Sequence, residues 1–320
     1  MACDVPQLPL GSNGRPIPLL GFGTAEYPLG STENLKEIVL RAIKLGYRHF
    51  DTAAAYRSEM PLGEAIAEAL ELGLVKSRDD LFVTSKLWCN DAHRERVIPA
   101  LRNSLRNLQL ECLDLYLVHW PMSLRPEAEL QPKEEDLLPF EMESVWKGME
   151  ECVKLGLVKC IGVSNFSCKK LDRLLAAAKI APVVNQVEMN PLWQQKKMRE
   201  FCVEKGIHVS AYSPLGGRGT VWGSNRVMDC EVLHPIATSR GKTIAQVCLR
   251  WAYEQGVSVI MKSFNEERMQ QNLHIFDWSL SPEELQKISR IPQIRACVPL
   301  GFISEKGPYK SLDEFWDGEI

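Results

Sequence analysis

Residues 158–212 read VKCIGVSNFSCKKLDRLLAAAKIAPVVNQVEMNPLWQQKKMREFCVEKGIHVSAY. Three short apolar runs, at 158–163, 182–186 and 207–212, are rich in β-branched or aromatic residues and are typical of strands. Between them, at 169–178 and 197–205, the apolar residues recur at helical spacing. A chain in which strands and helices alternate forms parallel strands with crossover helices, so this stretch predicts an α/β fold.

The same alternation continues on both sides of this stretch. Further strands are predicted near 18–22, 47–50, 81–84, 113–118 and 257–260, and further helices near 35–45, 62–74, 94–108, 142–155 and 244–254. Several helices are predicted to end at a glycine that leads into the next strand: Gly46, Gly156, Gly206 and Gly256. Eight strands in this arrangement favour a closed (β/α)8 TIM barrel over an open doubly wound sheet, with residues 1–320 as a single barrel domain.

Four segments depart from the alternation. Residues 10–18 are predicted to form an N-terminal hairpin that turns at Asn13-Gly14 and covers the floor of the barrel. Long loops are predicted at 122–140, 213–229 and 291–320. Because the first two of these loops follow predicted strands, we expect them on the C-terminal face of the barrel, where the active sites of such barrels lie.

The composition is that of an ordinary globular protein. Hydrophobic residues make up 45% of the 320 residues, charged residues 25%, and the formal net charge is -3. This balance gives no electrostatic basis for binding nucleic acid or an anionic membrane. No apolar run is long enough to cross a bilayer, and residues 1–10 lack the pattern of a secretory signal. The 10 cysteines are scattered without zinc-ligand spacing, so we expect reduced thiols, no metal and a cytoplasmic location.

Polar residues recur at the ends of the predicted strands. Asp51, Lys86 and His119 each end a predicted strand, and Tyr56 follows Asp51 closely. A tyrosine titrates near a pKa of about 10, and a neighbouring ammonium group favours the phenolate and so makes the tyrosine a better proton donor. A buried lysine needs a carboxylate partner such as Asp51. A histidine beside them can orient a substrate carbonyl, so the four residues suit protonation of an oxygen as a hydride reaches the carbon.

Each of these residues also has an ordinary structural explanation. A lysine at the end of a strand is more often exposed, a histidine beside a tryptophan more often packs in the core, and an aspartate after a strand often caps the next helix. The chemical interpretation therefore depends on the set as a whole. No dinucleotide fingerprint competes with it, because Gly21-Phe22-Gly23 lacks the third glycine.

Longer motifs resemble the aldo-keto reductase family and occur in the family's order over nearly the whole chain. They are the runs from Gly46 to Tyr56, Ser85 to Trp88, Asp114 to Pro121, Gly162 to Phe166 and Tyr212 to Gly216, and the pair Lys262-Ser263. The resemblance implies a (β/α)8 barrel that reduces a ketone or aldehyde to an alcohol with NADPH. It implies Tyr56 as the general acid, Asp51 and Lys86 as the pair that tunes it, and His119 as the residue that orients the carbonyl.

The resemblance also implies a binding site for NADPH/NADP+. The positions that match around the nicotinamide and its ribose are Gly23, Thr24, Asp51, Ser164, Asn165, Gln186 and Tyr212. Ser213 and Leu215 match contacts to the pyrophosphate. The positions that match at the adenosine 2′-phosphate and the adenine are Lys262, Ser263, Phe264, Arg268, Gln271 and Asn272. Two cations near one phosphate favour NADPH over NADH, although Gln271 stands where many relatives have a glutamate.

Four shorter runs resemble the plant branch of the family, which includes codeinone reductase, chalcone reductase, methylecgonone reductase, galacturonate reductase and deoxymugineic acid synthase. They are Thr52 to Tyr56, Leu62 to Leu70, Met149 to Cys152 and Asn190 to Lys197. This resemblance implies a ketone of plant specialised metabolism, such as an alkaloid or a polyketide. The candidate substrate-binding residues are Tyr27, Trp88, His119, Trp120, Trp193, Trp222 and Phe302. Such aromatic residues suit a flat or cyclic ketone, although any one of them can also be core packing.

Three alternatives stay open at this point. The substrate can be a sugar acid or an imine instead. The chain can be a non-catalytic NADPH-binding subunit that acts through a partner, which the intact set of four polar residues disfavours. It can be a metal-dependent hydrolase, although only His119 among the 6 histidines stands where a metal ligand would be needed. We expect a monomer that acts on a small-molecule carbonyl substrate and binds neither nucleic acid nor a membrane.

Overall fold

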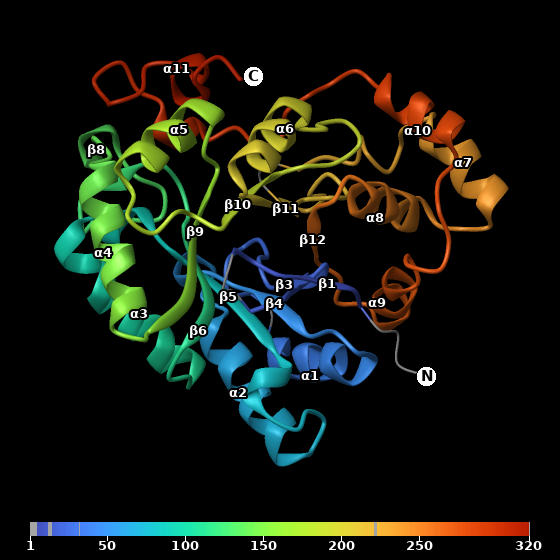
Figure 1. Cartoon of the computed structure of the whole chain (residues 1–320), viewed down its shortest axis with the longest axis horizontal. Coiled ribbons are helices and arrows are strands. Elements are labelled where there is room, and N and C mark those ends of the chain that lie inside the picture. The colour runs from blue at the N-terminus through green and yellow to red at the C-terminus, as the bar shows by residue number, and fades with distance from the viewer. Residues whose placement is uncertain (1–4, 12–14, 32, 221–222, 320) are drawn as a thin grey trace.

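The computed structural model describes residues 5–11, 15–31, 33–220 and 223–319. Among these residues, eight parallel strands close into a barrel in which each strand pairs with its neighbours along the chain and the last pairs with the first (Figure 1). The strands are β3 (Leu20–Gly23), β4 (His49–Asp51), β5 (Phe82–Leu87), β6 (Leu113–Val118), β9 (Val158–Ser164), β10 (Val184–Glu188), β11 (His208–Tyr212) and β12 (Ser258–Met261). The predicted (β/α)8 barrel is confirmed.

Helices surround the barrel and bury their apolar faces against it (Figure 1). Those between the barrel strands are α1 (Leu35–Leu45), α2 (Glu59–Glu71), α3 (Arg94–Leu108), α4 (Met142–Lys154), α5 (Cys168–Ala177), α6 (Lys196–Lys205), α7 (Leu233–Arg240) and α8 (Ile244–Glu254). After β12 come α9 (Glu266–Leu273), α10 (Pro282–Ser289) and α11 (Leu312–Trp316). No helix is predicted at α7, α9, α10 or α11, and the start of α2 is predicted three residues too late.

The early start of α2 has a simple cause. Pro61 lies in the first turn of the helix, where the missing backbone N–H group costs nothing because first-turn N–H groups have no partner within the helix. The predicted helix begins at Leu62 because the apolar residues at helical spacing start there. The proline therefore belongs to the helix instead of preceding it.

The N-terminal hairpin closes the floor of the barrel, as expected. Strands β1 (Gln7–Leu8) and β2 (Ile17–Pro18) pair antiparallel, while the predicted turn at Asn13-Gly14 lies outside the described residues. Leu10 and Ile17 are buried in one apolar cluster with Leu115 of β6. Apolar burial and strand pairing together therefore hold the hairpin against the N-terminal ends of the strands.

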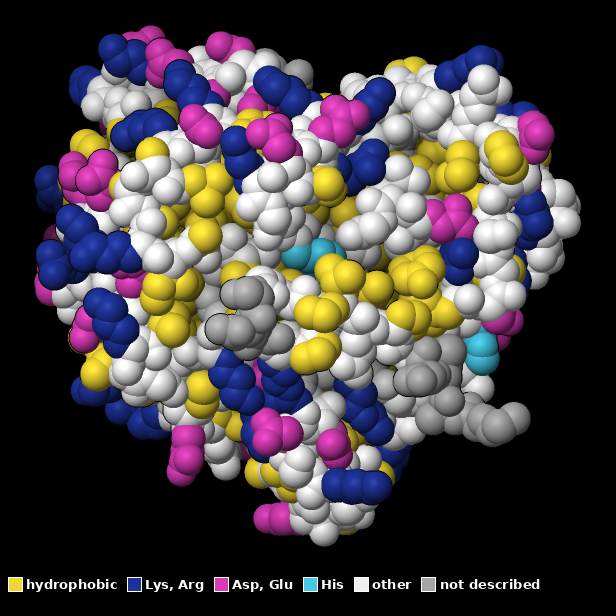
Figure 2. All heavy atoms as spheres, viewed as in Figure 1, with side chains coloured by type: hydrophobic (Ala, Val, Ile, Leu, Met, Phe, Trp, Pro, Cys, Tyr) yellow, Lys and Arg dark blue, Asp and Glu magenta, His cyan; other side chains and the backbone are white. Residues whose placement is uncertain are grey.

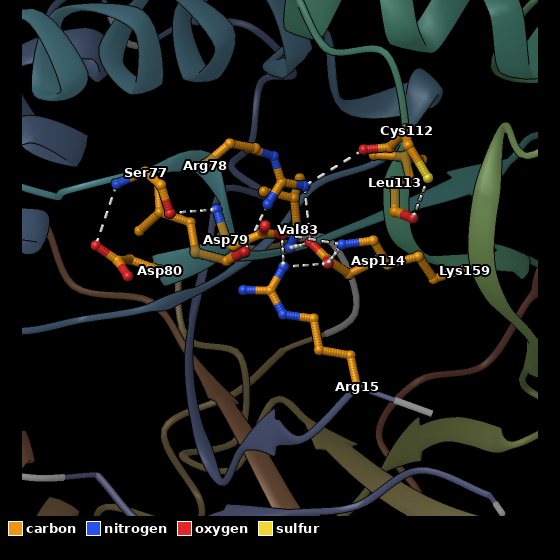
Figure 3. Close-up of polar contacts among 11 residues, drawn as sticks. Arg15, Ser77, Arg78, Asp79, Asp80, Val83, Cys112, Leu113, Asp114 and Lys159 are labelled. Carbon is orange, nitrogen blue, oxygen red and sulfur yellow. Dashed lines mark hydrogen bonds and ion pairs between the residues drawn. The ribbon is translucent and has the colours of Figure 1, made fainter. Parts of the chain in front are cut away.

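A cluster of charged side chains stabilises the same N-terminal face of the barrel (Figure 3). The fully buried carboxylate of Asp114, on β6, accepts hydrogen bonds from Arg15 at 2.9 Å and from Arg78 at 2.7 Å. It also accepts the backbone N–H of Val83 at 2.8 Å, and the Lys159 ammonium lies 3.4 Å away. Arg15 lies two residues before β2, Val83 on β5 and Lys159 on β9, so the cluster joins the hairpin to β5, β6 and β9.

The loops predicted at 122–140 and 291–320 pack on each other. The first contains a short antiparallel pair, β7 (Ser123–Leu124) and β8 (Leu137–Leu138), and the second contains α11. Buried side chains of both loops form one apolar cluster with Cys89, which follows β5: Met122, Leu124, Leu137, Phe302, Phe315 and Trp316. The C-terminal segment therefore covers the loop that follows β6.

The surface carries charges of both signs. In the view of Figure 2, lysine and arginine side chains alternate with aspartate and glutamate around the periphery, and apolar side chains gather nearer the centre. This mixture agrees with the formal net charge of -3. Within the described part of the chain, the helices are too short or too polar to cross a bilayer.

Candidate functional site

A cavity of about 790 Å³ lies at the carboxyl ends of the barrel strands. All of the predicted cofactor residues except Thr24 line it, and three of the predicted substrate residues do: Trp88, His119 and Trp120. Side chains that end different strands thus converge on one cavity, because the carboxyl ends of parallel strands lie at the same end of a barrel. The volume is in the range of cofactor and ligand sites.

Asp51 and Lys86 form a buried ion pair at the base of this cavity. The Lys86 ammonium donates to Oδ1 of Asp51 at 2.6 Å and to the carbonyl oxygen of Thr52 at 2.9 Å. The other carboxylate oxygen of Asp51 accepts the side-chain amide of Gln186 at 2.8 Å. Both oxygens therefore have partners, which a buried carboxylate requires.

Tyr56 and His119 meet above this ion pair. The Tyr56 hydroxyl lies 3.3 Å from Nε2 of His119, and the Lys86 ammonium lies 4.8 Å from the centroid of the Tyr56 ring. A short 3-10 turn, Ala54–Tyr56, directs Tyr56 back over the end of β4. The four predicted residues are thus brought together, and the hydroxyl and the imidazole can reach one substrate oxygen between them.

Burial controls the protonation of these groups. Burial raises the pKa of Tyr56 well above its ordinary value, and the negative charge of Asp51 adds to this. Burial also lowers the pKa of Lys86, although Asp51 opposes the change. Burial, and then the charge of Lys86, hold the pKa of His119 well below its ordinary value. At neutral pH the site therefore holds a protonated tyrosine and a neutral histidine.

This result corrects one expectation about Tyr56. From the sequence, the Lys86 ammonium is expected to favour the phenolate of Tyr56, whereas the surroundings as a whole raise the pKa of Tyr56. The physical reason is that burial of the phenol disfavours the charged phenolate, and the carboxylate of Asp51 offsets the positive charge of Lys86.

Asn165 organises the wall beside His119. Its side-chain amide donates to the carbonyl oxygen of His119 at 3.0 Å, and its Oδ1 accepts the Tyr212 hydroxyl at 2.8 Å. Asn165 has a φ of 62° and Ser213 a φ of 49°, so both strand ends bend sharply into the cavity. Such left-handed residues are strained and are common at binding sites.

The far end of the cavity is cationic. Lys262 and Arg268 line it where α9 begins, and the side chain of Asn265 caps this helix by accepting the N–H of Arg268 at 2.9 Å. Gln271 lines the same end and donates to Glu267 at 3.2 Å. Two cations suit a phosphate group. This donor set and the amides of Asn165 and Gln186 at the other end fit a phosphorylated nicotinamide dinucleotide.

Thr24 does not line the cavity. Its hydroxyl and its N–H both donate to the carbonyl oxygen of Asp51 at 3.0 Å. The hydroxyl also lies 2.8 Å from that of Ser58. Because its hydroxyl is engaged in these two contacts, Thr24 supports the backbone of Asp51 and does not face the cavity.

The predicted substrate residues divide into two groups. Trp88 and Trp120 line the cavity, and their rings flank His119 with centroid distances of 5.1 and 6.4 Å. Three others do not line it: Tyr27 is about half exposed, Trp193 is covered by the Arg295 guanidinium at 4.6 Å, and Phe302 is buried behind Trp88 and Trp120. Trp222 lies outside the described residues. Aromatic character alone therefore does not show which of these residues line the cavity.

Several lining residues are missing from the prediction. They are mostly apolar or come from the loops: Ala25, Leu29, Ala55, Leu130, Gly217, Arg218, Met228 and Cys297.

Cys297 is held in the cavity wall by Glu188, whose carboxylate accepts the N–H groups of Ala296 and Cys297 at 3.1 and 2.8 Å. Burial, and then the charge of Glu188, raises the pKa of the Cys297 thiol to about 12. Glu188 lies on β10, and nothing in the sequence indicates its contact with the C-terminal segment.

Comparisons with known proteins agree with this geometry. The model of the aldo/keto reductase family matches residues 19–292. A (1S)-1,7-diacetoxy-luvungin A aldo-keto reductase of Citrus sinensis is 65% identical over all of both chains. Deoxymugineic acid synthase 1-A of Triticum aestivum is 60% identical over 95% of this chain and 97% of its own. The crystal structure of a Bombyx mori aldo-keto reductase in complex with NADP superimposes with a TM-score of 0.83, at 36% identity over 92% of this chain and 95% of that one.

The family match covers most of the chain, and both relatives exceed half identity over nearly their full lengths. Family, barrel and cavity thus agree, and neither a metal-dependent hydrolase nor a non-catalytic subunit is needed to account for them. The chain belongs to the aldo/keto reductase family and is an oxidoreductase that acts on carbonyl compounds.

Proposed function

We propose that this protein uses NADPH to reduce a ketone or aldehyde of plant specialised metabolism, with Tyr56 as the general acid. The observation that carries the proposal is the 3.3 Å contact between the Tyr56 hydroxyl and His119 Nε2 inside the cavity. One carbonyl oxygen placed there can accept hydrogen bonds from both groups. The carbonyl is thereby held in one orientation and polarised.

The residues then have separate roles. NADPH, when bound, supplies the hydride that the carbonyl carbon gains. Tyr56 gives its phenolic proton to the carbonyl oxygen, so the product is the neutral alcohol and the tyrosine becomes a phenolate. The Lys86 ammonium, held by Asp51, lies close enough to the Tyr56 ring to stabilise that phenolate. His119 stays neutral and donates to the oxygen without giving up a proton.

We propose that the cofactor lies along the cavity between two groups of residues. Asn165, Gln186 and Tyr212 would hold the nicotinamide end, and Lys262 and Arg268 the 2′-phosphate. The Bombyx mori aldo-keto reductase was solved in complex with NADP, which supports the choice of this cofactor. The preference for a second phosphate follows from the two cations, since charge-assisted hydrogen bonds are the strong ones.

We propose a bulky, mainly apolar carbonyl compound as substrate. The rings of Trp88 and Trp120 flank His119, and Leu29, Leu130 and Met228 also line the cavity. Such a surface favours a flat or cyclic ketone, because it offers area for packing and few hydrogen-bonding groups. The names of the Citrus sinensis and Melia azedarach relatives, which refer to diacetoxy and acetyl compounds, support this class. A sugar acid or an imine would meet few polar partners there.

Substitution of Tyr56 by phenylalanine tests the reaction. We expect Tyr56→Phe to lower kcat for carbonyl reduction by at least about 100-fold, the usual contribution of a general acid. NADPH binding, followed by quenching of tryptophan fluorescence, should be unchanged. The matched control is Tyr253→Phe, which removes the same hydroxyl from a ring on α8 that packs on Phe276. Turnover of Tyr56→Phe at the wild-type rate would show that the mechanism is wrong.

We also propose that the protein is a cytoplasmic monomer. The nine cysteines in the described ranges are all free thiols, which supports the location. Reduced thiols are usual in the cytosol. Light scattering of the purified protein and the location of a fluorescent fusion test the two parts separately.

A further inference from the structure

The aromatic wall of the cavity rests on the C-terminal segment of the chain. Trp120 contacts the rings of Phe302, Phe315 and Trp316 at centroid distances of 5.7, 6.0 and 6.2 Å. Trp88 contacts Phe302 at 6.4 Å. Both tryptophans therefore pack against the C-terminal segment as well as against the barrel. The position of the wall therefore depends on what fixes α11 and the residues around it.

One buried ammonium group fixes α11. Lys170 lies in the first turn of α5, and its side chain is 6% exposed. Its Nζ donates to the carbonyl oxygen of Phe315 and to the carboxylate of Asp317, both at 2.6 Å. A cation at the last turn of a helix is favourable, because the unpaired carbonyl groups there carry partial negative charge. The contact joins α5 to α11, which lie side by side in Figure 1.

The same ammonium group also lies against the aromatic rings of the segment. It is 5.2 Å from the centroid of Tyr309 and 5.7 Å from that of Phe315, which are distances typical of cation–π contacts. The Tyr309 hydroxyl donates to the carbonyl oxygen of Pro121 at 3.1 Å, and Pro121 follows Trp120 directly. Lys170 is thus linked to Trp120 by two routes, through Phe315 and through Tyr309.

The start of α5 adds further bonds to the same end of the chain. The Ser167 hydroxyl donates to Asp317 at 2.5 Å, and the N–H of Cys168 donates to the carboxylate of Glu319 at 3.1 Å. Since α5 directly follows β9, whose end carries Ser164 and Asn165 in the cavity, it has a fixed place on the barrel. The C-terminal segment is therefore anchored to a rigid element beside the site.

We propose that Lys170 is a positioning residue that sets the place of the Trp88–Trp120 wall and thereby decides which carbonyl compounds fit the cavity. Lys170 does not line the cavity and does not touch the reacting atoms. Its effect is carried by α11 and Tyr309 to Trp120. The inference rests on the proposed carbonyl reduction, because it concerns the substrate end of that same cavity.

The test compares a small substrate with a wide one. Lys170→Met keeps the length of the side chain but removes the charge and both hydrogen bonds. We expect it to raise the KM for isatin, a flat bicyclic ketone, by about tenfold, as a misfitted group does in an apolar pocket. The KM for propanal, the kcat for both compounds and the affinity for NADPH should stay within about twofold, because propanal need not touch the wall and the cofactor end is distant.

Two further variants separate positioning from simple stability. Lys169→Met is the matched control: it removes the same charge from the neighbouring residue, which is 72% exposed and lies 3.7 Å from the same Asp317. It should leave both KM values unchanged. Lys170→Arg keeps the charge and the donors, so it should restore most of the isatin affinity. If Lys170→Met does not fold, Asp317→Asn weakens the same contact and should raise the KM for isatin alone.

The outcomes are distinguishable. If the wild-type protein oxidises NADPH with neither isatin nor propanal, the proposed function fails. If the wild-type protein is active and the ratio of the two KM values is unchanged in Lys170→Met, the positioning role is overturned, even if the melting temperature falls. An equal rise of both KM values, or the same rise in Lys170→Arg as in Lys170→Met, also overturns it.

Discussion

At the scale of single residues, the site is governed by which polar atoms are buried and paired. Asp51 receives one partner on each carboxylate oxygen, Lys86 from β5 and Gln186 from β10. The first partner could be inferred from the sequence, because a buried lysine needs a carboxylate. The second could not, because 135 positions separate Asp51 from Gln186 and only barrel closure brings them together.

The protonation states predict how the rate depends on pH. Tyr56, whose pKa is raised, stays protonated through neutral pH, and His119, whose pKa is lowered, stays uncharged there. We expect kcat/KM for reduction to be flat from about pH 6.5 to 8 and to fall at alkaline pH. The fall should begin with loss of the Lys86 proton, since the pKa of Lys86 is lowered from 10.5 while that of Tyr56 is raised.

Measurement of kcat/KM for isatin between pH 5.5 and 10 checks this expectation. A change with a midpoint near pH 6.5 that disappears in His119→Gln would contradict it, because it would show that the imidazole titrates at its ordinary pKa of about 6.5.

At the scale of elements, the strands are predicted better than the helices that follow the last strand. Period-two or continuous apolar runs mark every barrel strand, and the observed ends differ by a few residues. The helix α10 has a clear start in the sequence, because Ser281, Pro282 and Glu284 form a capping box with a first-turn proline. It is short and has few buried residues, so the apolar periodicity on which the prediction depends is weak there.

A close contact between two helices supplies a prediction at this scale. Gly63 of α2 faces the backbone of Leu108 at the end of α3, and an added Cβ would lie 2.5 Å from the Leu108 carbonyl oxygen. Alanine is the better helix former by about 1 kcal/mol. We nevertheless expect Gly63→Ala to destabilise the protein by about 1–3 kcal/mol, because neither backbone can move without displacing its helix.

Urea unfolding followed by circular dichroism measures this change in the free energy of unfolding. Glu64→Ala, at the exposed neighbouring position of the same helix, is the control and should change it by less than about 0.5 kcal/mol. A stabilised Gly63→Ala variant would mean that α2 and α3 are less tightly packed than the structure shows.

At the scale of the whole molecule, stability and chemistry are concentrated at opposite ends of the barrel. The charge cluster around Asp114 joins the hairpin to β5, β6 and β9 on the N-terminal face (Figure 3). The cavity occupies the other face. In such barrels, residues at the N-terminal face usually serve stability and residues at the C-terminal face usually serve catalysis.

This division predicts the effect of Asp114→Asn. The change leaves three cations without their buried partner, so we expect a loss of about 2–4 kcal/mol in the free energy of unfolding, with kcat unchanged below the melting temperature. Asp79→Asn removes an equal charge from the same cluster at a side chain that is 78% exposed. It should cost less than about 1 kcal/mol. Equal losses in the two variants, or a fall in kcat for Asp114→Asn, would contradict the assignment.

The sequence alone predicts the barrel and the set of polar residues that the cavity brings together. The alternation of strand and helix patterns is local, and it places Asp51, Lys86 and His119 at strand ends whatever the details of packing. Only the tertiary structure decided that burial raises the pKa of Tyr56, that Trp193 and Phe302 lie outside the cavity, and that Lys170 anchors the aromatic wall. Desolvation and contacts between distant segments depend on which atoms the fold packs around each group. A local pattern of residues does not determine that packing.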